Sequence, residues 1–544
     1  MKKGFTLVEL LGVIVILGIL MLVIFPSVVG VIKGKSEEKD AKIDDIVKNS
    51  VDLLIKENPN NYSKIDNKLY CISVGSLKDK GYITKEIIKS NNKINEDTLI
   101  EIKYTQKDGY QYNYNQNCNP NDPIACYNYE QIDENSVRIL DYFDYEFDNQ
   151  NNLPCSKSIS IPSKINGFEV KEINEKAFYK KSLSYVTIPS TVTKIGEYAF
   201  AYNSIKDIKI PNSVVSIDGW SFIDNDFSNV ELVIPDSVET IGDSAFYNTK
   251  LKSVILGKGL KSISSSFNNN KLIKVVNRKD DTDSRNITDG IVYARNQDAT
   301  VDYSTIVSYG GENSEVKIPS GVTTLKKKAF AGTNLSKVTI PKTVIIMENI
   351  VFNNNNIQSV INEVDGEDTK GIIYARNSDG TIDYTTIASF GGRNNVEIPN
   401  KVTNLYDYAF YSDHLTSVTL STSLKKISSN AFEANNLTSI NIPSSVTEIG
   451  SNAFKTNKLT SVSIPDSVEL IGKYAFYDNK LSTITLGSGI TKIDSYAFYF
   501  INSGSSQHIL NINVNMLESD FSKVEKGNSW YNKNNITTTI NYKS

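Results

Sequence analysis

The sequence has little of what enzymes and nucleic-acid-binding proteins need. It contains two histidines, His414 and His508, far apart and without a G-x-S-x-G segment, so no Ser–His–Asp or Cys–His arrangement is indicated. It has no G-x-x-x-x-G-K-[ST] loop, which excludes a P-loop motor. The net charge of -4 comes without a basic stripe, which argues against nucleic acid as a partner. We therefore expect a protein that is not an enzyme and uses no cofactor.

A metal site is poorly indicated as well. The four cysteines lack the paired C-x-x-C spacing of a zinc site. One stretch is crowded with aspartates, but it lacks the central Gly and the terminal Glu of an EF-hand calcium loop. Those aspartates are Asp280, Asp281, Asp283 and Asp289. We expect a solvated acidic loop and no metal, with calcium as the alternative.

One long hydrophobic run is present, and it starts almost at the N-terminus. From Phe5 to Phe25 only Thr6 and Glu9 are polar. At 1.5 Å per residue this run makes about 30 Å of helix, enough to cross the hydrocarbon core of a bilayer. Two lysines precede it, so the charge bias places the short N-terminus in the cytoplasm and exports the rest. The run is too long for a signal peptide and lacks a small-x-small cleavage site.

The first residues resemble the start of a type IV prepilin. KGFTLVE, residues 3–9, matches that family's K-G-F-T-L-x-E signature after a short basic leader, residues 1–4. The resemblance implies that a prepilin peptidase cuts between Gly4 and Phe5 and N-methylates Phe5. It also implies that Glu9 faces the N-terminal amine of a neighbouring pilin subunit. A carboxylate inside an apolar helix is costly without such a partner, so the physics agrees. An ordinary signal anchor that carries a Glu is the alternative.

The cysteines all follow this segment, in the part of the chain that would be exported. Their number is even and they are clustered, which predicts disulfides. Three pairings are possible. We favour Cys71–Cys118 with Cys126–Cys155, because each bond then closes within one domain.

A small head is expected between the hydrophobic run and residue 125. Apolar residues recur at steps of three and four from Ile43 to Ile55, which predicts an amphipathic helix that ends at Asn58-Pro59. The stretch that follows reads as a short helix and a hairpin, with its turn at Asp108-Gly109. Residues 26–125 resemble the helix and compact α/β head of Gram-positive pilin-like proteins.

From about residue 159 the chain is repetitive. Most repeats are 22 residues long and carry one marker phenylalanine. The twelve markers are Phe178, Phe200, Phe222, Phe246, Phe267, Phe330, Phe352, Phe410, Phe432, Phe454, Phe476 and Phe498. These units resemble the BspA-like leucine-rich repeats of bacterial surface proteins. The resemblance implies a mainly-β solenoid over residues 175–502.

A single repeat can be interpreted from its residues alone. Leu459-x-x-Val462-x-Ile464 alternates as a short strand with one face inward, and the proline that follows ends it. Gly472 is expected to permit the next turn, and Phe476 is expected to fill the core. Asn stands three residues after the marker in seven units, where stacked amides would satisfy buried turn backbone. These are Asn203, Asn225, Asn270, Asn355, Asn435, Asn457 and Asn479.

Two insertions and two caps complete the predicted solenoid. Near-identical segments at residues 290–311 and 371–392 alternate around a turn and predict hairpins that extend a coil. Residues 126–174 are expected to form the N-terminal cap. Residues 503–544 are expected to form the C-terminal cap, with Trp530 and Tyr531 packed on the last coil.

Together these patterns predict an α+β multidomain chain: a transmembrane helix over residues 5–25, a small pilin-like α/β head, and a mainly-β solenoid. The hairpin side chains are candidate ligand contacts, although their duplication equally favours a structural role. They are Tyr293, Arg295, Tyr374 and Arg376.

The predicted function is that of a minor type IV pilin-like subunit that displays an adhesion module outside the cell. Its expected partners are the prepilin peptidase, other pilin subunits, the cytoplasmic membrane and an extracellular protein or glycan. The expected localisation is single-pass in the membrane, with the N-terminus cytoplasmic and the bulk extracellular, on a surface pilus. The alternatives are a pseudopilin of a type II secretion or DNA-uptake system and a membrane-anchored adhesin that does not polymerise.

Overall fold

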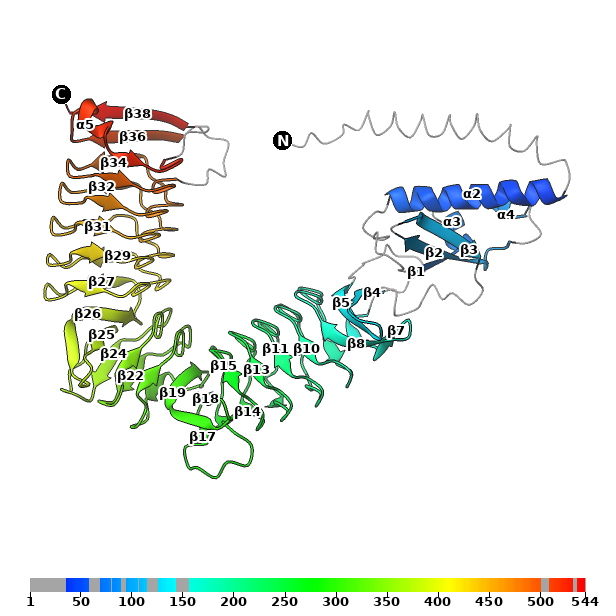
Figure 1. The fold of residues 1–544 in the computed structure, drawn as a ribbon, viewed down its shortest axis with the longest axis horizontal. Coiled ribbons are helices and arrows are strands. Elements are labelled where there is room, and N and C mark those ends of the chain that lie inside the picture. The colour runs from blue at the N-terminus through cyan, green and yellow to red at the C-terminus, as the bar shows by residue number, and fades with distance from the viewer. Residues whose placement is uncertain are drawn as a thin grey trace. The chain divides into compact units, whose positions relative to one another are not determined.

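The computed structural model describes residues 36–57, 69–79, 81–89, 94–105, 107–114, 126–142, 156–499, 508–531 and 536–543 (Figure 1). They belong to two compact units, one holding the chain up to Asn128 and the other holding Tyr129–Tyr142 and Ser156 onward. The predicted membrane segment 5–25 lies outside the described residues. Among those described, no helix is both long enough and apolar enough to cross a bilayer.

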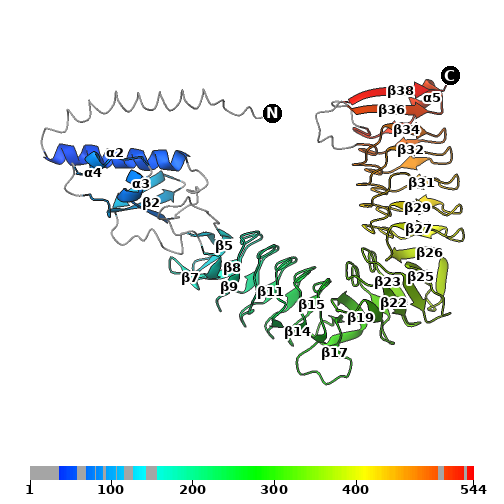
Figure 2. The same cartoon turned by 180° about the vertical axis from the view of Figure 1, so that it is seen from behind.

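The first unit packs one long helix and two short ones on a three-stranded antiparallel sheet of order β1-β2-β3. The long helix α2 lies along the sheet in both views (Figures 1 and 2). Its elements are α2 (Ser36–Glu57), β1 (Leu69–Ser73), α3 (Val74–Asp79), α4 (Lys85–Lys89), β2 (Leu99–Thr105) and β3 (Gly109–Tyr114).

The apolar spacing seen in the sequence is the face that α2 buries. Ile43, Val47, Val51 and Leu54 are each at most 2% exposed and pack in one cluster with residues of both short helices and of the sheet, such as Ile102. Burying such side chains contributes about 1.5–3 kcal/mol each relative to exposing them. The amphipathic helix predicted here is therefore confirmed.

Tyrosines and a serine join α2 to the rest of the first unit. The Tyr114 hydroxyl donates to Asp44 at 2.9 Å, and the Tyr112 hydroxyl donates to Asp52. Ser50 Oγ donates to the Tyr82 carbonyl at 2.8 Å. These bonds fix the rotation of α2 about its axis, since they come from two separate turns of the helix, one at Asp44 and one at Ser50 and Asp52.

The second unit is a solenoid in which most coils contribute two short strands, and equivalent strands of successive coils pair in parallel. One ladder uses the first strand of each coil. Its strands are β6 (Ser158–Ser160), β9 (Tyr185–Thr187), β12 (Glu231–Val233), β14 (Ser253–Ile255), β16 (Lys274–Val276), β20 (Glu315–Lys317), β22 (Lys337–Ile340), β24 (Ser359–Asn362), β27 (Asn395–Glu397), β29 (Ser417–Thr419), β32 (Ser461–Ser463), β34 (Thr483–Leu486), β36 (His508–Val514) and β38 (Ile536–Tyr542). The short strand β17 (Ile287–Thr288) pairs antiparallel with β16 and is not part of this parallel ladder.

The other ladder uses the second strand of each coil and starts from the pair β4 (Tyr127–Gln131) and β5 (Ser136–Tyr142). Its remaining strands up to the first insertion are β7 (Lys164–Ile165), β8 (Phe168–Ile173), β10 (Lys194–Ile195), β11 (Ser216–Ile217), β13 (Thr240–Ile241) and β15 (Ser262–Ile263). Those after it are β21 (Thr324–Leu325), β23 (Ile346–Met347), β28 (Asn404–Leu405), β30 (Lys426–Ile427), β31 (Glu448–Ile449), β33 (Leu470–Ile471), β35 (Lys492–Ile493) and β37 (Glu525–Lys526).

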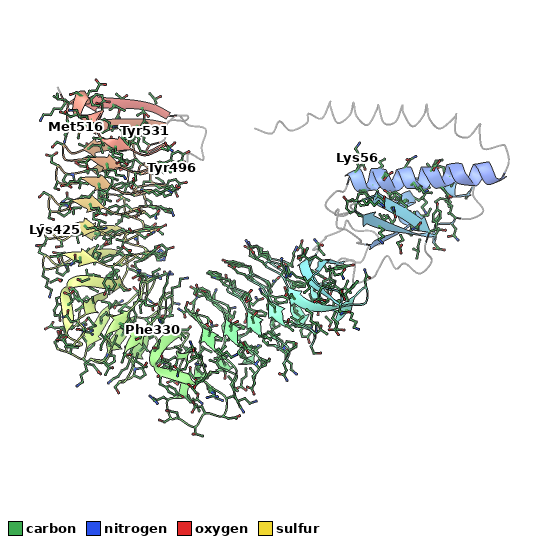
Figure 3. The ribbon with its side chains drawn as sticks, in the orientation of Figure 1. Lys56, Phe330, Lys425, Tyr496, Met516 and Tyr531 are labelled. Carbon is green, nitrogen blue, oxygen red and sulfur yellow. The ribbon has the colours of Figure 1, made fainter. Side chains whose placement is uncertain are left out.

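The marker phenylalanines form a stack through the core. All twelve are at most 1% exposed, and neighbouring rings such as Phe454 and Phe476 lie parallel with centroids 5.3 Å apart. Phe330 is labelled in Figure 3. Where an insertion lengthens the repeat, Tyr309 and Phe390 take the place of the missing marker, 5.4 and 5.2 Å from the next ring. Each of these two rings therefore starts the run of stacked rings that follows its insertion.

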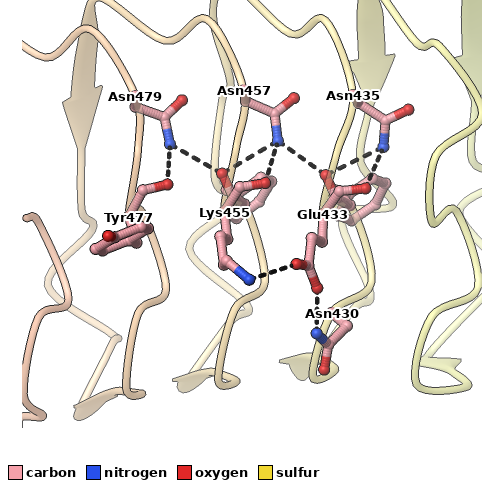
Figure 4. Close-up of polar contacts among 9 residues, drawn as sticks. Asn430, Glu433, Asn435, Lys455, Asn457, Tyr477 and Asn479 are labelled. Atoms are coloured by element: carbon pink, nitrogen blue, oxygen red, sulfur yellow. Dashed lines mark hydrogen bonds and ion pairs between the residues drawn. The ribbon is translucent and has the colours of Figure 1, made fainter. Parts of the chain in front are cut away.

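The asparagines form the predicted ladder (Figure 4). Asn457 Oδ1 accepts the Leu437 N–H at 3.1 Å, and its Nδ2 donates to the Phe432 and Phe454 carbonyls at 2.9 and 3.1 Å. The other six repeat this pattern. Each amide therefore bonds buried backbone of two neighbouring coils, and the prediction is confirmed.

At most markers the backbone is left-handed two residues before and two residues after the phenylalanine. In the coil of Phe476 these residues are Tyr474 and Asp478, with φ of 59° and 56°. Gly472 is instead required by close approach, because a Cβ there would lie 2.7 Å from the Ser451 nitrogen in the preceding coil. The turn role predicted for Gly472 is therefore wrong, and coil-to-coil contact is the reason for this glycine.

Each duplicated segment is an antiparallel hairpin, formed by β18 (Ile291–Arg295) with β19 (Val301–Tyr309) and by β25 (Ile372–Arg376) with β26 (Ile382–Phe390). The second strand of each hairpin continues into the ladder by pairing in parallel with β21 or β28. At the C-terminal end, α5 (Glu518–Phe521), β36, β37 and β38 extend both ladders. Trp530 packs edge-on against Phe498, the last marker, at 6.2 Å.

Candidate functional site

Several predicted site residues cannot be placed. Gly4, Phe5 and Glu9 lie outside the described residues, and so do Cys118 and Cys155. Cys126 is disulfide-bonded. Cys71 lies in β1, opposite Glu101 of β2. The pairing of the four cysteines stays a prediction.

The hairpin tyrosines are core residues, which corrects the prediction that they contact a ligand. Tyr293 and Tyr374 are 1% and 6% exposed. Each packs edge-to-face on the tyrosine of the facing strand, Tyr303 or Tyr384, with centroids 5.1 and 4.9 Å apart. The reason is a bulge on either side of each inner tyrosine, which breaks the alternation and turns the side chain inward.

The hairpin arginines are largely buried and bond backbone or amide groups. Arg295 Nη1 donates to the Tyr293 carbonyl at 2.7 Å, and its Nη2 donates to the Asn277 carbonyl. Arg376 Nη2 donates to Asn362 Oδ1 at 2.8 Å. Buried N–H groups remain without a partner at Nε of both arginines and at Nη1 of Arg376. Burial lowers the pKa of Arg295 to about 10, so this guanidinium still carries its charge at neutral pH.

A basic cavity of about 400 Å³ opens beside the first hairpin. Five basic and two acidic side chains line it, together with the hydroxyls of three serines. The charged residues are Asp243, Lys261, Arg295, Lys326, Lys327, Lys328 and Glu348, and the serines are Ser262, Ser264 and Ser265. We call this the basic cavity.

A second, wider cavity of about 820 Å³ lies beside the second hairpin. Its wall mixes carboxylates with aromatic rings. The ammonium of Lys401 lies 3.7 Å from the ring centroid of Tyr384, whose hydroxyl donates to Asp365. An intramolecular cation already covers the aromatic face here, so this cavity is the weaker candidate.

The residues considered for chemistry lie in ordinary structural contacts. His414 is a left-handed turn residue, with φ of 57°, and its Nε2 lies 3.0 Å from Asn354 Oδ1. In the acidic loop, Asp280 pairs with Lys258 at 2.7 Å and Asp283 pairs with Arg285 at 2.6 Å. Within the described part of the chain, no group of His, Cys, Asp or Glu is placed to hold a metal ion.

One buried carboxyl was missed by the sequence reasoning. Asp413 stands three residues after Phe410, where other coils carry the ladder asparagine, and it is 0% exposed. It accepts from the Asn354 N–H at 2.7 Å and from Asn353 Nδ2 at 3.1 Å. Burial raises the pKa of Asp413 well above its ordinary value. The departure from Asn at this phase of the repeat was visible in the sequence.

Two family models match the chain. The BspA type leucine rich repeat region matches in six copies at residues 171–284, 308–368 and 381–504, which is more than half of the 544 residues. The prokaryotic N-terminal methylation motif matches residues 1–25. The repeat matches leave out the first strand of each hairpin, consistent with the hairpins being insertions.

Solved structures resemble the chain at low identity. The pneumococcal vaccine antigen PcpA is 20% identical, with 76% of this chain and 96% of that chain covered and a TM-score of 0.36. A leucine-rich repeat protein from Bacteroides ovatus is 19% identical, with coverages of 77% and 98% and a TM-score of 0.30. A leucine rich cell surface protein from Faecalibacterium prausnitzii is 17% identical, with coverages of 74% and 96% and a TM-score of 0.30.

One curated protein also matches. The translationally-controlled tumor protein homolog of Loxosceles intermedia is 31% identical over 122 residues, which are 21% of this chain and 69% of that protein. Because that match takes in about a fifth of the chain and the repeat model more than half, we assign the chain by its repeats.

The fold and these matches define a mainly-β repeat protein with a prepilin-like N-terminus. The chain belongs to the BspA-type leucine-rich repeat family. This combination indicates a surface-exposed adhesion module, and the motif implies processing by a prepilin peptidase.

Proposed function

We propose that this protein is a minor type IV pilin-like subunit that carries a leucine-rich-repeat binding module to the outside of the cell. The single observation that supports it is the joining, in one chain, of the methylation motif at residues 1–25 to the repeat array. The motif contains the residues that a prepilin peptidase recognises. A pseudopilin that only drives secretion would not need the long repeat array.

The first unit is consistent with this role. Helix α2 packs its apolar face on a small sheet, the arrangement expected of a compact head at the base of an assembly helix. The repeat unit is far bulkier than a subunit that must pack side by side along a whole filament. A minor subunit, which occurs at few positions, avoids that crowding.

Mass spectrometry of the mature N-terminus tests the proposal. From sheared surface filaments we expect a peptide that begins at Phe5 and carries one methyl group. An intact Met1 end, found in the membrane fraction alone, would refute processing and leave a tethered repeat protein.

Replacing Glu9 by Ala separates assembly from anchoring. An assembling subunit should lose incorporation into filaments, because the N-terminal amine of its neighbour loses its counter-ion. A plain membrane anchor should be indifferent to the change or gain stability in the bilayer. Loss of secretion or transformation in a deletion strain, with adhesion intact, would favour a pseudopilin instead.

A further inference from the structure

We propose that the basic cavity is a binding site for an acidic saccharide, recognised through its carboxylate and its hydroxyl groups. This inference deepens the proposed function, because it names the ligand class of the displayed module. It rests on three features of the cavity: a buried guanidinium in its wall, a triplet of lysines found in one coil, and exposed hydroxyls next to them.

The guanidinium supplies a fixed positive charge. Arg295 lines the cavity and is bonded to backbone carbonyls at 2.7 and 3.1 Å, while its Nε has no partner. Within the described part of the chain, no carboxylate forms an ion pair with it. Asp281 opposes this charge through a Coulombic interaction without forming an ion pair, and an anion entering the cavity would stabilise the buried cation further.

Only the middle lysine of the triplet lacks an ion pair among the described residues. Lys326 pairs with Glu348 and Lys328 pairs with Asp243, both at 2.7 Å. Lys327 is exposed, and among the described residues its ammonium forms no ion pair, although the Glu348 carboxylate accepts its backbone N–H at 2.9 Å and interacts with its charge. Two of the three lysine charges are therefore neutralised within the protein, and the ammonium of Lys327 is the one left to pair with an anionic ligand.

The second hairpin offers an internal comparison. It carries the same arginine, Arg376, in the same place at the end of its first strand. The coil that follows it has Tyr406-Asp407-Tyr408 where the first has Lys326-Lys327-Lys328. The arginine is therefore common to both insertions, as a structural residue would be, whereas the lysines belong to the first insertion alone.

The remaining wall suits a polyhydroxylated ligand. Ser262 and Ser264 are exposed at the cavity edge, and a hydroxyl both donates and accepts hydrogen bonds. The carboxylates of Asp243 and Glu348 add acceptors for ligand hydroxyls. A sugar acid presents the matching set of one anionic group and several hydroxyls, and its rigid ring costs little entropy on binding.

Calorimetric titration of the purified full chain tests the proposal, with trigalacturonate as the acidic probe, maltotriose as the neutral probe and inorganic phosphate as the simple anion. We expect trigalacturonate to bind and maltotriose to show no saturable binding. Lys327→Gln should weaken binding of trigalacturonate roughly three- to tenfold, as expected for a charge at the rim of a site.

Lys473→Gln is the matched control, because Lys473 also stands three residues before its marker phenylalanine but lies outside the cavity. It should leave the affinity unchanged, and both variants should unfold at the temperature of the wild type. Equal weakening by both variants would mean a diffuse surface attraction and would overturn the proposal. So would the absence of trigalacturonate binding, or phosphate binding as tight as the saccharide. The mass of the N-terminal peptide tests the proposed function and does not depend on these binding results. The saccharide proposal can therefore fail while the proposed function stands.

Discussion

Removing one amide from the ladder should destabilise the solenoid more than any surface change. In Asn457→Ala, the Leu437 N–H loses its acceptor at 3.1 Å and has no other hydrogen bond to the described residues. A buried donor left unsatisfied costs about 1–3 kcal/mol. The Phe432 and Phe454 carbonyls each lose one bond but keep another, from Asn435 or Asn479.

Each lost carbonyl bond costs about 1 kcal/mol. The three losses together predict destabilisation of about 3–5 kcal/mol, at the upper end of single substitutions. The loss should be concentrated in the coils next to Leu437, because a solenoid couples each repeat mainly to its neighbours. Asn457→Asp keeps the acceptor for Leu437 but turns a carboxylate toward two carbonyls, so it should destabilise at neutral pH and recover in acid.

Hydrogen exchange of the full chain, read by mass spectrometry, measures the opening of these coils directly. Urea unfolding followed by circular dichroism gives the total change. Asn436→Ala is the control, because this neighbouring asparagine makes no side-chain hydrogen bond among those of the described residues, and it should change stability by less than about 0.5 kcal/mol. If Asn457→Ala matched this control, the ladder would not be what stabilises the turns.

Three further predictions concern single positions. Asp413→Asn should raise the urea midpoint at pH 7 and leave it nearly unchanged at pH 4. Burial raises the pKa of Asp413 in the native state, so the wild type is most stable below the ordinary carboxyl pKa, where this group is protonated. As the pH rises from there toward the native pKa, the wild type loses about 1.4 kcal/mol of stability per pH unit. Thr456→Asn should raise the free energy of unfolding by about 1 kcal/mol, since this exposed β-branched residue has φ of 54° and Asn tolerates that conformation; an unchanged urea midpoint would contradict this. Gly472→Ala should lower it by about 1–3 kcal/mol, because its Cβ would meet the backbone of the preceding coil at 2.7 Å, and faster exchange of that coil would show it.

The repeat unit was readable from sequence where its information is periodic. The period of 22 residues, the inward strand residues and the ladder asparagines all recur at a fixed phase. Stacked coils bring residues at the same position of the repeat into contact, so the repeat pattern in the sequence predicts the contacts in the structure. The apolar face of α2 was readable for the same reason, since helical spacing alone decides which side chains meet the sheet.

The direction of the side chains in the hairpins could not be predicted in this way. Simple alternation left Tyr293 and Tyr374 as candidate surface residues, but a bulge re-aims each into the core. A bulge of one residue moves the side chains that follow it to the opposite face of the strand, and nothing in the composition of these segments marks the bulge. Gly472 was likewise assigned to a turn, because contact between coils cannot be read from one repeat.

The sequence by itself therefore determined the prepilin-like N-terminus, the repeat fold and the asparagine ladder, because each depends on a short motif or on a fixed period. Only the tertiary structure decided that residues from Asp243 to Glu348 share one basic cavity and that the Asp413 carboxyl is buried. Both depend on how the inserted hairpins meet the coils on either side. That meeting is set by packing between segments far apart in the chain, which local pattern does not encode.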